Sequence, residues 1–173
     1  ANAGLTLTVP EVNSMGLAIL GGQSLEQAFA QDYDTIVIVE NDLYRRLPAK
    51  QIDAALAKAK DIIVLDHAET ETVKKANIVL SAASFAEGDG TVVSQEGRAQ
   101  RFYQVYDASY YKPEYAIKES WRWIHAIETG VKGQAISWTV LDDVIESVAK
   151  NVPALEAIQD VSPNAGFRVH GLK

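Results

Sequence analysis

The sequence predicts an α/β fold with three layers, in which helices cover both faces of a mostly parallel sheet, followed by a helical C-terminal part. Three apolar runs rich in β-branched residues predict buried strands over 35–39, 62–65 and 77–80. Helical patterns separate these runs. Strands that alternate with helices at this spacing form βαβ units with right-handed crossovers, and these units build a parallel sheet.

The N-terminal part predicts a strand, a loop and a short helix. Residues 5–9 alternate and favour a strand. A loop that carries Asn13 and Gly16 follows. Ser24 and Gln27 form a capping box, so we expect a short helix to begin at this point.

Helix signals lie between the predicted parallel strands. Pro48 opens a predicted helix that runs through Lys60, with Ile52 and Leu56 on its apolar face. Thr70 is placed to cap a second helix, over 71–76.

The stretch after the third predicted strand is rich in small and acidic residues. Residues 87–91 predict a loop, Val92 and Val93 an extended segment, and Gly97 a bend. Because opposite charges flank Gly97, we expect an ion pair or bidentate hydrogen bonds between Glu96 and Arg98 to pin the bend.

The C-terminal part predicts three helices and a tail. The first runs over 116–130 and ends at Gly130. Thr139 caps the second, over 140–150, and Pro153 starts a short third helix to residue 158. We therefore expect a single domain over residues 1–173, whose parts are a core over 1–110, a helical extension over 111–160 and a tail over 161–173.

The acidic composition restricts the partners. The 173 residues include 16 Lys and Arg against 23 Asp and Glu, a net charge of −7. This balance argues against nucleic-acid binding, which needs clustered basic residues. No apolar run approaches the roughly 18 residues that span a bilayer, so we expect no direct membrane insertion. The chain does not begin with Met, and we expect it to be a fragment of a longer polypeptide.

Metal ligands are sparse. The chain has no cysteine, which excludes a cysteine-ligated iron–sulfur cluster or zinc site built from these residues alone. His67, His125 and His170 are far apart in the sequence, and we predict no metal site. No Gly-x-x-x-x-Gly-Lys phosphate loop or G-x-S-x-G nucleophile motif occurs either, and no catalytic residue is predicted.

Polar and small residues follow the predicted strands at their carboxyl ends, where parallel sheets bind ligands. They are Glu40, Asn41, Asp42, Asp66, His67 and residues 81–84. Asp66 is the strongest candidate, since a carboxylate at this place can accept hydrogen bonds from a ribose or a guanine edge. The structural alternative is that Asp66 accepts hydrogen bonds from nearby backbone amides.

A spaced motif carries a family resemblance. Its residues are Glu87, Gly90, Thr91, Glu96, Gly97, Arg98 and Gln100, in the pattern E-x-x-G-T-x-x-x-x-E-G-R-x-Q. The pattern is similar to one in the molybdopterin oxidoreductase superfamily, which includes dimethyl sulfoxide reductases and formate dehydrogenases. Ser94 departs from the pattern, because many members carry Asn at this place.

The residues around the motif look closest to the branch formed by the large iron–sulfur subunit of respiratory complex I. That resemblance implies part of an NADH–quinone oxidoreductase, in its peripheral arm on the cytoplasmic side of the inner membrane. It implies iron–sulfur clusters elsewhere in the subunit, no pterin cofactor in this fragment, and a scaffold role. The implied partners are other domains of the subunit and other complex I subunits.

The resemblance also implies a degenerate cofactor edge made of Asn13, Gly16, Asn41, Asp66 and Thr72. Asp66 begins a D-x-x-x-T-E-T arrangement, in which the family's acidic residue contacts the nucleotide end of the cofactor. Two alternatives remain open. The chain could be a molybdopterin-dinucleotide-binding domain of an active oxidoreductase, or an unrelated nucleotide-binding module, although the latter lacks a phosphate fingerprint.

Overall fold

The computed structural model describes residues 4–6, 8–134 and 138–160, which belong to two compact units. The sheet unit draws on Gln23–Gly88 and Gln104–Ile136. The hairpin unit draws on Ala1–Gly22, Asp89–Tyr103 and Ser137–Lys173. Each unit is assembled from separate stretches of the chain, and the predicted division into a core over 1–110, a helical extension and a tail stays a prediction.

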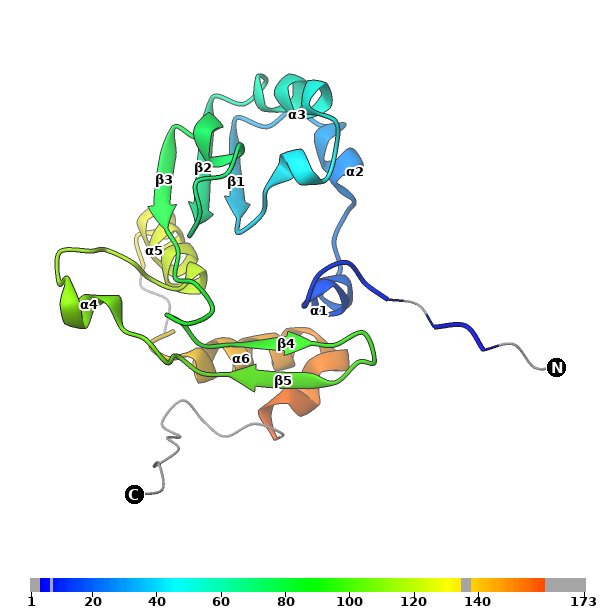
Figure 1. Cartoon of the computed structure of the whole chain (residues 1–173), viewed down its shortest axis with the longest axis vertical. Helices are drawn as coiled ribbons and strands as arrows, with labels where there is room; N and C mark the ends of the chain where they lie inside the picture. Colours follow the sequence, from blue (N-terminus) through cyan, green and yellow to red (C-terminus); the bar gives the residue numbers. More distant parts are fainter. Residues whose placement is uncertain (1–3, 7, 135–137, 161–173) are drawn as a thin grey trace. The chain divides into compact units, whose positions relative to one another are not determined.

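The sheet unit is built on a three-stranded parallel sheet, as predicted. Its strands are β1 (Thr35–Val39), β2 (Asp61–Asp66) and β3 (Ile78–Ser81), in the order β1-β2-β3 (Figure 1). In the register of the sheet, Ile63 lies opposite Val37 on one side and opposite Ile78 on the other. The predicted strands are confirmed to within one residue at each end.

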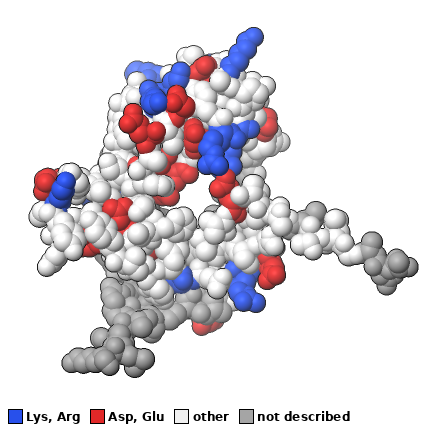
Figure 2. All heavy atoms as spheres, in the orientation of Figure 1, with Lys and Arg blue, Asp and Glu red and all other residues white. Residues whose placement is uncertain are grey.

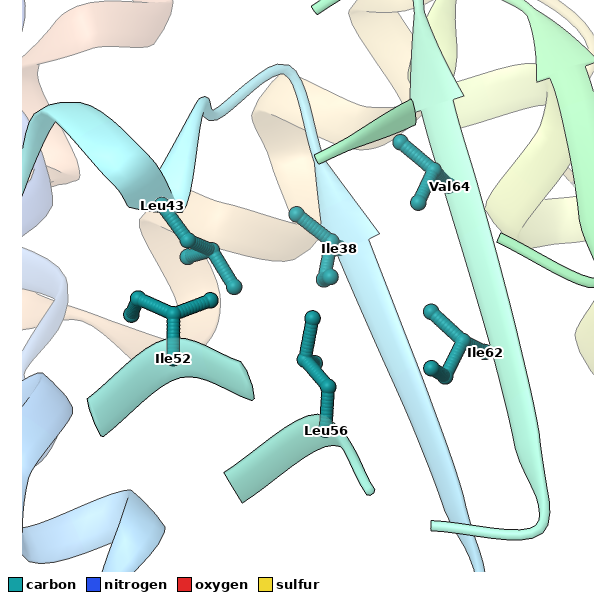
Figure 3. Packing of buried hydrophobic residues seen from close by; sticks show 6 residues of the cluster. All are labelled: Ile38, Leu43, Ile52, Leu56, Ile62 and Val64. Atoms are coloured by element: carbon teal, nitrogen blue, oxygen red, sulfur yellow. The ribbon is translucent and has the colours of Figure 1, made fainter. Parts of the chain in front are cut away.

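The core of the sheet unit lies on one face of β1 and β2. Helix α3 (Ala49–Leu56) covers this face, and its apolar stripe packs against the strands (Figure 3). A short 3-10 helix, η1 (Leu43–Arg45), closes one end. The buried cluster consists of Ile38, Leu43, Ile52, Leu56, Ile62 and Val64. Burial of each of these side chains stabilises the fold by roughly 2 kcal/mol.

Two predicted helices are shorter than expected because residues at or just after their C-terminal ends form hydrogen bonds with the sheet. The backbone amides of Lys60 and Asp61 donate to the Asp34 carbonyl oxygen at 2.8 and 2.9 Å, so α3 ends at Leu56 instead of continuing through Lys60. Asn77 pairs with Ile62 through its backbone and its side chain, at 2.8 and 2.7 Å. Only a 3-10 turn, η2 (Val73–Lys75), fits before it in place of the predicted α-helix.

The remaining helices of the sheet unit are α2 (Leu25–Phe29), α4 (Ala108–Tyr111) and α5 (Ser120–Lys132). The predicted capping box of α2 is confirmed, since Ser24 and Gln27 exchange hydrogen bonds. The predicted stop of α5 at Gly130 is wrong. The helix continues to Lys132 and ends at Gly133, whose φ of 67° is left-handed and whose amide donates to the Thr129 carbonyl.

In its described residues, the hairpin unit contains a two-stranded antiparallel hairpin and three helical segments. Strand β4 (Gly90–Val93) pairs with β5 (Ala99–Phe102). The helical segments are α1 (Ser14–Leu20), α6 (Leu141–Asn151) and the 3-10 helix η3 (Pro153–Gln159). Strand β5 was not predicted, while the short helix expected at Pro153 is confirmed in position. The predicted tail lies outside the described residues.

Two predictions for the N-terminal part are wrong. Described residues 4–6 and 8–9 form no strand, although they alternate, because no described residue pairs with them. The loop expected around Gly16 is helical instead. Ser14 accepts a hydrogen bond from the Glu11 amide and Leu17 donates to the Asn13 carbonyl, which together start α1.

Helix α6 begins at Leu141, and its start is capped by a residue from within the helix. The Asp143 carboxylate accepts hydrogen bonds from the amides of Thr139 and Val140, at 2.6 and 3.0 Å, and from the Thr139 hydroxyl at 3.0 Å. These bonds lower the pKa of Asp143, the backbone bond from Val140 most. The predicted cap by Thr139 is corrected: Thr139 donates, and Asp143 supplies the capping oxygen.

The described residues carry charges of both signs on the surface of the sheet unit. Figure 2 shows Lys and Arg interspersed with Asp and Glu over the visible face of the sheet unit. Among residues 4–6, 8–134 and 138–160, no helix combines the length and apolar character needed to cross a bilayer.

Candidate ligand edge of the parallel sheet

The chain leaves β1 through a strained residue, Glu40. It has a φ of 47°, the only positive φ among the described residues other than glycine. Its amide donates to the Leu65 carbonyl oxygen at 2.7 Å, and its carboxylate accepts a hydrogen bond from the Ser120 hydroxyl at the start of α5. Backbone and side chain are therefore both held, which is the condition under which such strain persists.

Asp66 lies at the end of β2, as predicted, and is only 8% exposed. Its Oδ1 accepts hydrogen bonds from the amides of His67 and Ala68, at 2.8 and 3.2 Å, and lies 3.5 Å from Nδ1 of His67. This is the structural alternative that the sequence offered. The carboxylate closes the turn after its own strand.

Thr72 and Asn41 also bind neighbours in the sheet unit. Thr72 is fully buried, and its hydroxyl donates to Asp42 Oδ1 and accepts from the Leu43 amide, both at 2.8 Å. It thereby ties the segment before β3 to the loop after β1. Asn41 Oδ1 accepts a hydrogen bond from Nε of Arg46 at 3.0 Å.

Glu87 lies where the chain leaves the sheet unit, and it is bound by Ser84. Its Oε2 accepts hydrogen bonds from the Ser84 hydroxyl at 2.7 Å and from the Ser84 amide at 3.0 Å. The two bonds lower the pKa of Glu87, the hydroxyl bond most, and the nearby His67 lowers it further. Glu87 and Ser84 are thus joined directly at the carboxyl edge.

We expect Ser84→Ala to reduce stability in a pH-dependent way. Because the folded-state pKa of Glu87 lies below its unfolded value of 4.5, the hydroxyl bond stabilises the fold above that pH and loses its effect as the pH falls through the folded pKa. Urea unfolding at pH 3 to 7 should show the largest difference from wild type above pH 4.5. A difference that does not change with pH would contradict this account, and Glu87→Gln serves as the non-titrating control.

The predicted residues Asn13 and Gly16 belong to the hairpin unit, whereas Asn41, Asp66 and Thr72 belong to the sheet unit. Asn13 Oδ1 accepts a hydrogen bond from the Val93 amide at 2.8 Å, which ties α1 to β4. Gly16 is buried directly beneath this side chain, so a Cβ at Gly16 would come within 2.2 Å of Asn13 Oδ1.

Most of the motif residues form the β4–β5 hairpin. Gly90 and Thr91 lie in β4 and Gln100 in β5. Packing favours glycine at position 90, because a Cβ there would lie 2.6 Å from the Phe102 ring. Glu96, Gly97 and Arg98 lie in the turn between the strands.

The predicted ion pair across this turn is wrong. Glu96 and Arg98 are exposed and form no ion pair in the described structure. Ser94 holds the turn instead: its hydroxyl accepts from the amides of both residues at 3.3 Å, and its amide donates to the Arg98 carbonyl at 2.9 Å. Gly97 supplies the left-handed φ of 79°.

Sequence reasoning missed Arg101, the most buried cation among the described residues of the hairpin unit. Its side chain is 2% exposed and donates to Asp142 Oδ1 at 2.8 Å, with Asp89 at 3.6 Å. The guanidinium carbon lies 5.4 Å from the centre of the Tyr103 ring. Without a predicted β5, no pattern assigned Arg101 to a buried face.

Comparisons with known proteins agree with the resemblance. The family model "Molybdopterin oxidoreductase" matches residues 22–128. A subunit of the NADH-quinone oxidoreductase of Pseudomonas putida is 51% identical over 99% of this chain, and the corresponding subunit of Escherichia coli O6:H1 is 48% identical over all of it. The chain spans about a fifth of the length of these relatives, 20% in both. The chain belongs to the molybdopterin oxidoreductase family.

Proposed function

We propose that this chain is a cofactor-less scaffold segment within the iron–sulfur subunit of an NADH–quinone oxidoreductase, and that it supports electron transfer from NADH to quinone. The names of its relatives support the assembly, since both similar proteins described above are subunits of that enzyme. On this proposal the whole subunit belongs to an oxidoreductase, and this segment performs no chemical step.

One observation carries the scaffold role: the polar side chains of the candidate ligand edge already have hydrogen-bond partners within the sheet unit. Asp66 accepts from its own turn, Thr72 bridges Asp42 and Leu43, and Glu40 accepts from Ser120. A ligand that recruited these groups would displace their present partners, and a buried polar group that loses its partner costs about 1 to 3 kcal/mol. These existing partners support the proposal that this edge holds no pterin dinucleotide.

The remaining parts of the proposal concern cofactors and partners. The chain has no cysteine, so iron–sulfur clusters would be held by cysteines elsewhere in the subunit. The partners would be other domains of the subunit and other subunits of the complex, in the peripheral arm on the cytoplasmic side of the membrane. An acidic surface with interspersed charges suits such protein contacts better than nucleic acid.

Asp66→Ala in the full-length subunit tests this function. We expect the assembled complex to retain NADH–quinone activity within about twofold, because the substitution removes only the turn contacts of one carboxylate, worth roughly 1 kcal/mol. The measurement is quinone reduction per assembled complex. Asp61→Ala, at the opposite end of the same strand, is the matched control.

Two outcomes would contradict the scaffold proposal. One is a loss of quinone reduction in Asp66→Ala with normal assembly, while Asp61→Ala stays active. The other is a native mass spectrum of the subunit, purified without added ligand, that shows the extra mass of a pterin dinucleotide or another nucleotide. That result would favour an active molybdopterin domain or a nucleotide-binding module. We expect the mass of the polypeptide with its iron–sulfur clusters alone.

A further inference from the structure

The hairpin unit contains a cavity between its hairpin and its helices. Thr91 and Val93 point to the same side of β4, because the side chains of a strand alternate. Arg101 lies opposite Thr91 in the register and binds Asp142 of α6, so this side faces α6 (Figure 1). The cavity on this side has a volume of about 170 Å³, and residues of α1, β4, α6 and η3 line it.

The lining of the cavity is mostly apolar. Ile145 of α6 and both Leu155 and Ile158 of η3 contribute buried side chains. Leu20 of α1 also lines the cavity but is 48% exposed, so it marks the opening to solvent. None of the described residues in the lining carries a charge. A charged ligand would lose its hydration here without gaining an opposite charge, and the cavity therefore suits an uncharged molecule.

Thr91 is the residue that points to a ligand. Its hydroxyl oxygen is buried and has no hydrogen-bond partner among the described residues, whereas most buried hydroxyl groups have one. A threonine hydroxyl can donate one hydrogen bond and accept two. Asn13 lines the same cavity. Its Oδ1 accepts from the Val93 amide, and its Nδ2 donates to no described residue. The cavity thus offers a hydroxyl and an amide donor within an apolar lining.

The volume of the cavity sets the size of the ligand. An apolar protein cavity of about 150 Å³ accepts a benzene molecule, while sites for drug-sized molecules measure at least roughly 300 Å³. We propose that the hairpin unit binds an uncharged, single-ring aromatic molecule of the phenol class. The ring contacts the apolar side chains of α6 and η3, and the polar group of the ligand forms a hydrogen bond with the Thr91 hydroxyl.

This site is separate from the candidate ligand edge and does not depend on the proposed function. All residues that line the cavity belong to the hairpin unit, whereas Asp66 and Thr72 belong to the sheet unit. Thr91 is also one of the spaced motif residues, and the scaffold role gives its side chain no task. A binding site for a small aromatic molecule would give this side chain a hydrogen-bond partner.

Fluorine NMR with the full-length subunit tests the site. Two probes of similar shape, para-fluorophenol and para-fluorotoluene, differ in carrying a hydroxyl or a methyl group. We expect saturable broadening of the para-fluorophenol signal by the wild-type subunit, with a Kd on the order of 1 mM. Thr91→Val keeps the shape of the side chain and removes its hydroxyl. It should weaken para-fluorophenol binding about fivefold, the effect of one hydrogen bond, without weakening para-fluorotoluene binding.

Two further variants localise the binding. Thr129→Val is the matched control, because Thr129 of α5 also has a buried hydroxyl without a described partner but belongs to the sheet unit. It should leave the affinity for both probes unchanged. Ile145→Phe fills the cavity and should abolish saturable binding of both probes, with circular dichroism to verify that the variant is folded. Thr91→Val, which changes no volume, decides the test if Ile145→Phe does not fold.

Three outcomes would overturn the proposal. One is the absence of saturable para-fluorophenol binding to the wild-type subunit, which would mean that another part of the polypeptide fills the cavity. The second is an equal effect of Thr91→Val and Thr129→Val on para-fluorophenol binding. The third is unchanged binding of both probes by a folded Ile145→Phe variant, which would place the bound molecules elsewhere in the subunit.

Discussion

Replacing Arg101 by methionine is expected to lower the free energy of unfolding of the chain by about 3 kcal/mol. The guanidinium is buried between β5 and α6, and its loss leaves the Asp142 carboxylate without its nearest cation. Asp142 is 37% exposed, so water screens part of the effect, and the expected loss lies at the lower end of the range for buried pairs. Urea unfolding followed by circular dichroism measures it.

Arg98→Ala is the matched control for this prediction. Arg98 lies three residues before Arg101 but is exposed, and its side chain forms none of the described ion pairs. Its removal should change the free energy of unfolding by less than about 0.5 kcal/mol. Equal losses for the two variants would mean that the charge of this region matters, and not the buried contact between Arg101 and Asp142.

The parallel sheet could be predicted because each of its strands carries its own signal. Residues 35–39 form a run of β-branched residues, and the helix after them has apolar residues at the spacing of one helix face. The hairpin unit gave no such signal. Strand β5 reads Ala-Gln-Arg-Phe, in which the inward residue is an arginine. Burial of Arg101 depends on Asp142, 41 residues further along the chain, and no local pattern reveals that partner.

The candidate site divides in the same way. The turn closed by Asp66 involves the next two residues, so sequence reasoning could offer it as an alternative. The partners of Asn13 and Glu40, in contrast, are each 80 residues away. Their side chains resemble free ligand groups in the sequence, and only the fold shows that they bind Val93 and Ser120.

Gly16→Ala is expected to destabilise the chain by about 2 kcal/mol, although alanine normally favours a helix by about 1 kcal/mol over glycine. The reason is the Asn13 side chain, which packs against Gly16. A Cβ would lie 2.2 Å from Asn13 Oδ1, so the Asn13 side chain must move, and the Val93 amide of β4 then loses its acceptor. Urea unfolding of the single variant should show a loss where helix propensity alone predicts a gain.

Two further variants separate the clash from the propensity of the helix. Gly130→Ala, inside α5, places its Cβ in open space and should stabilise the chain by about 0.5 to 1 kcal/mol. Asn13→Ala removes the colliding side chain, and in that background Gly16→Ala should no longer destabilise, which a double-mutant cycle measures as a coupling of about 2 kcal/mol. A cycle without coupling would mean that Gly16 is required for a reason other than Asn13. Coupling of the expected sign would show that Asn13 and Gly16 act together as the link between α1 and β4.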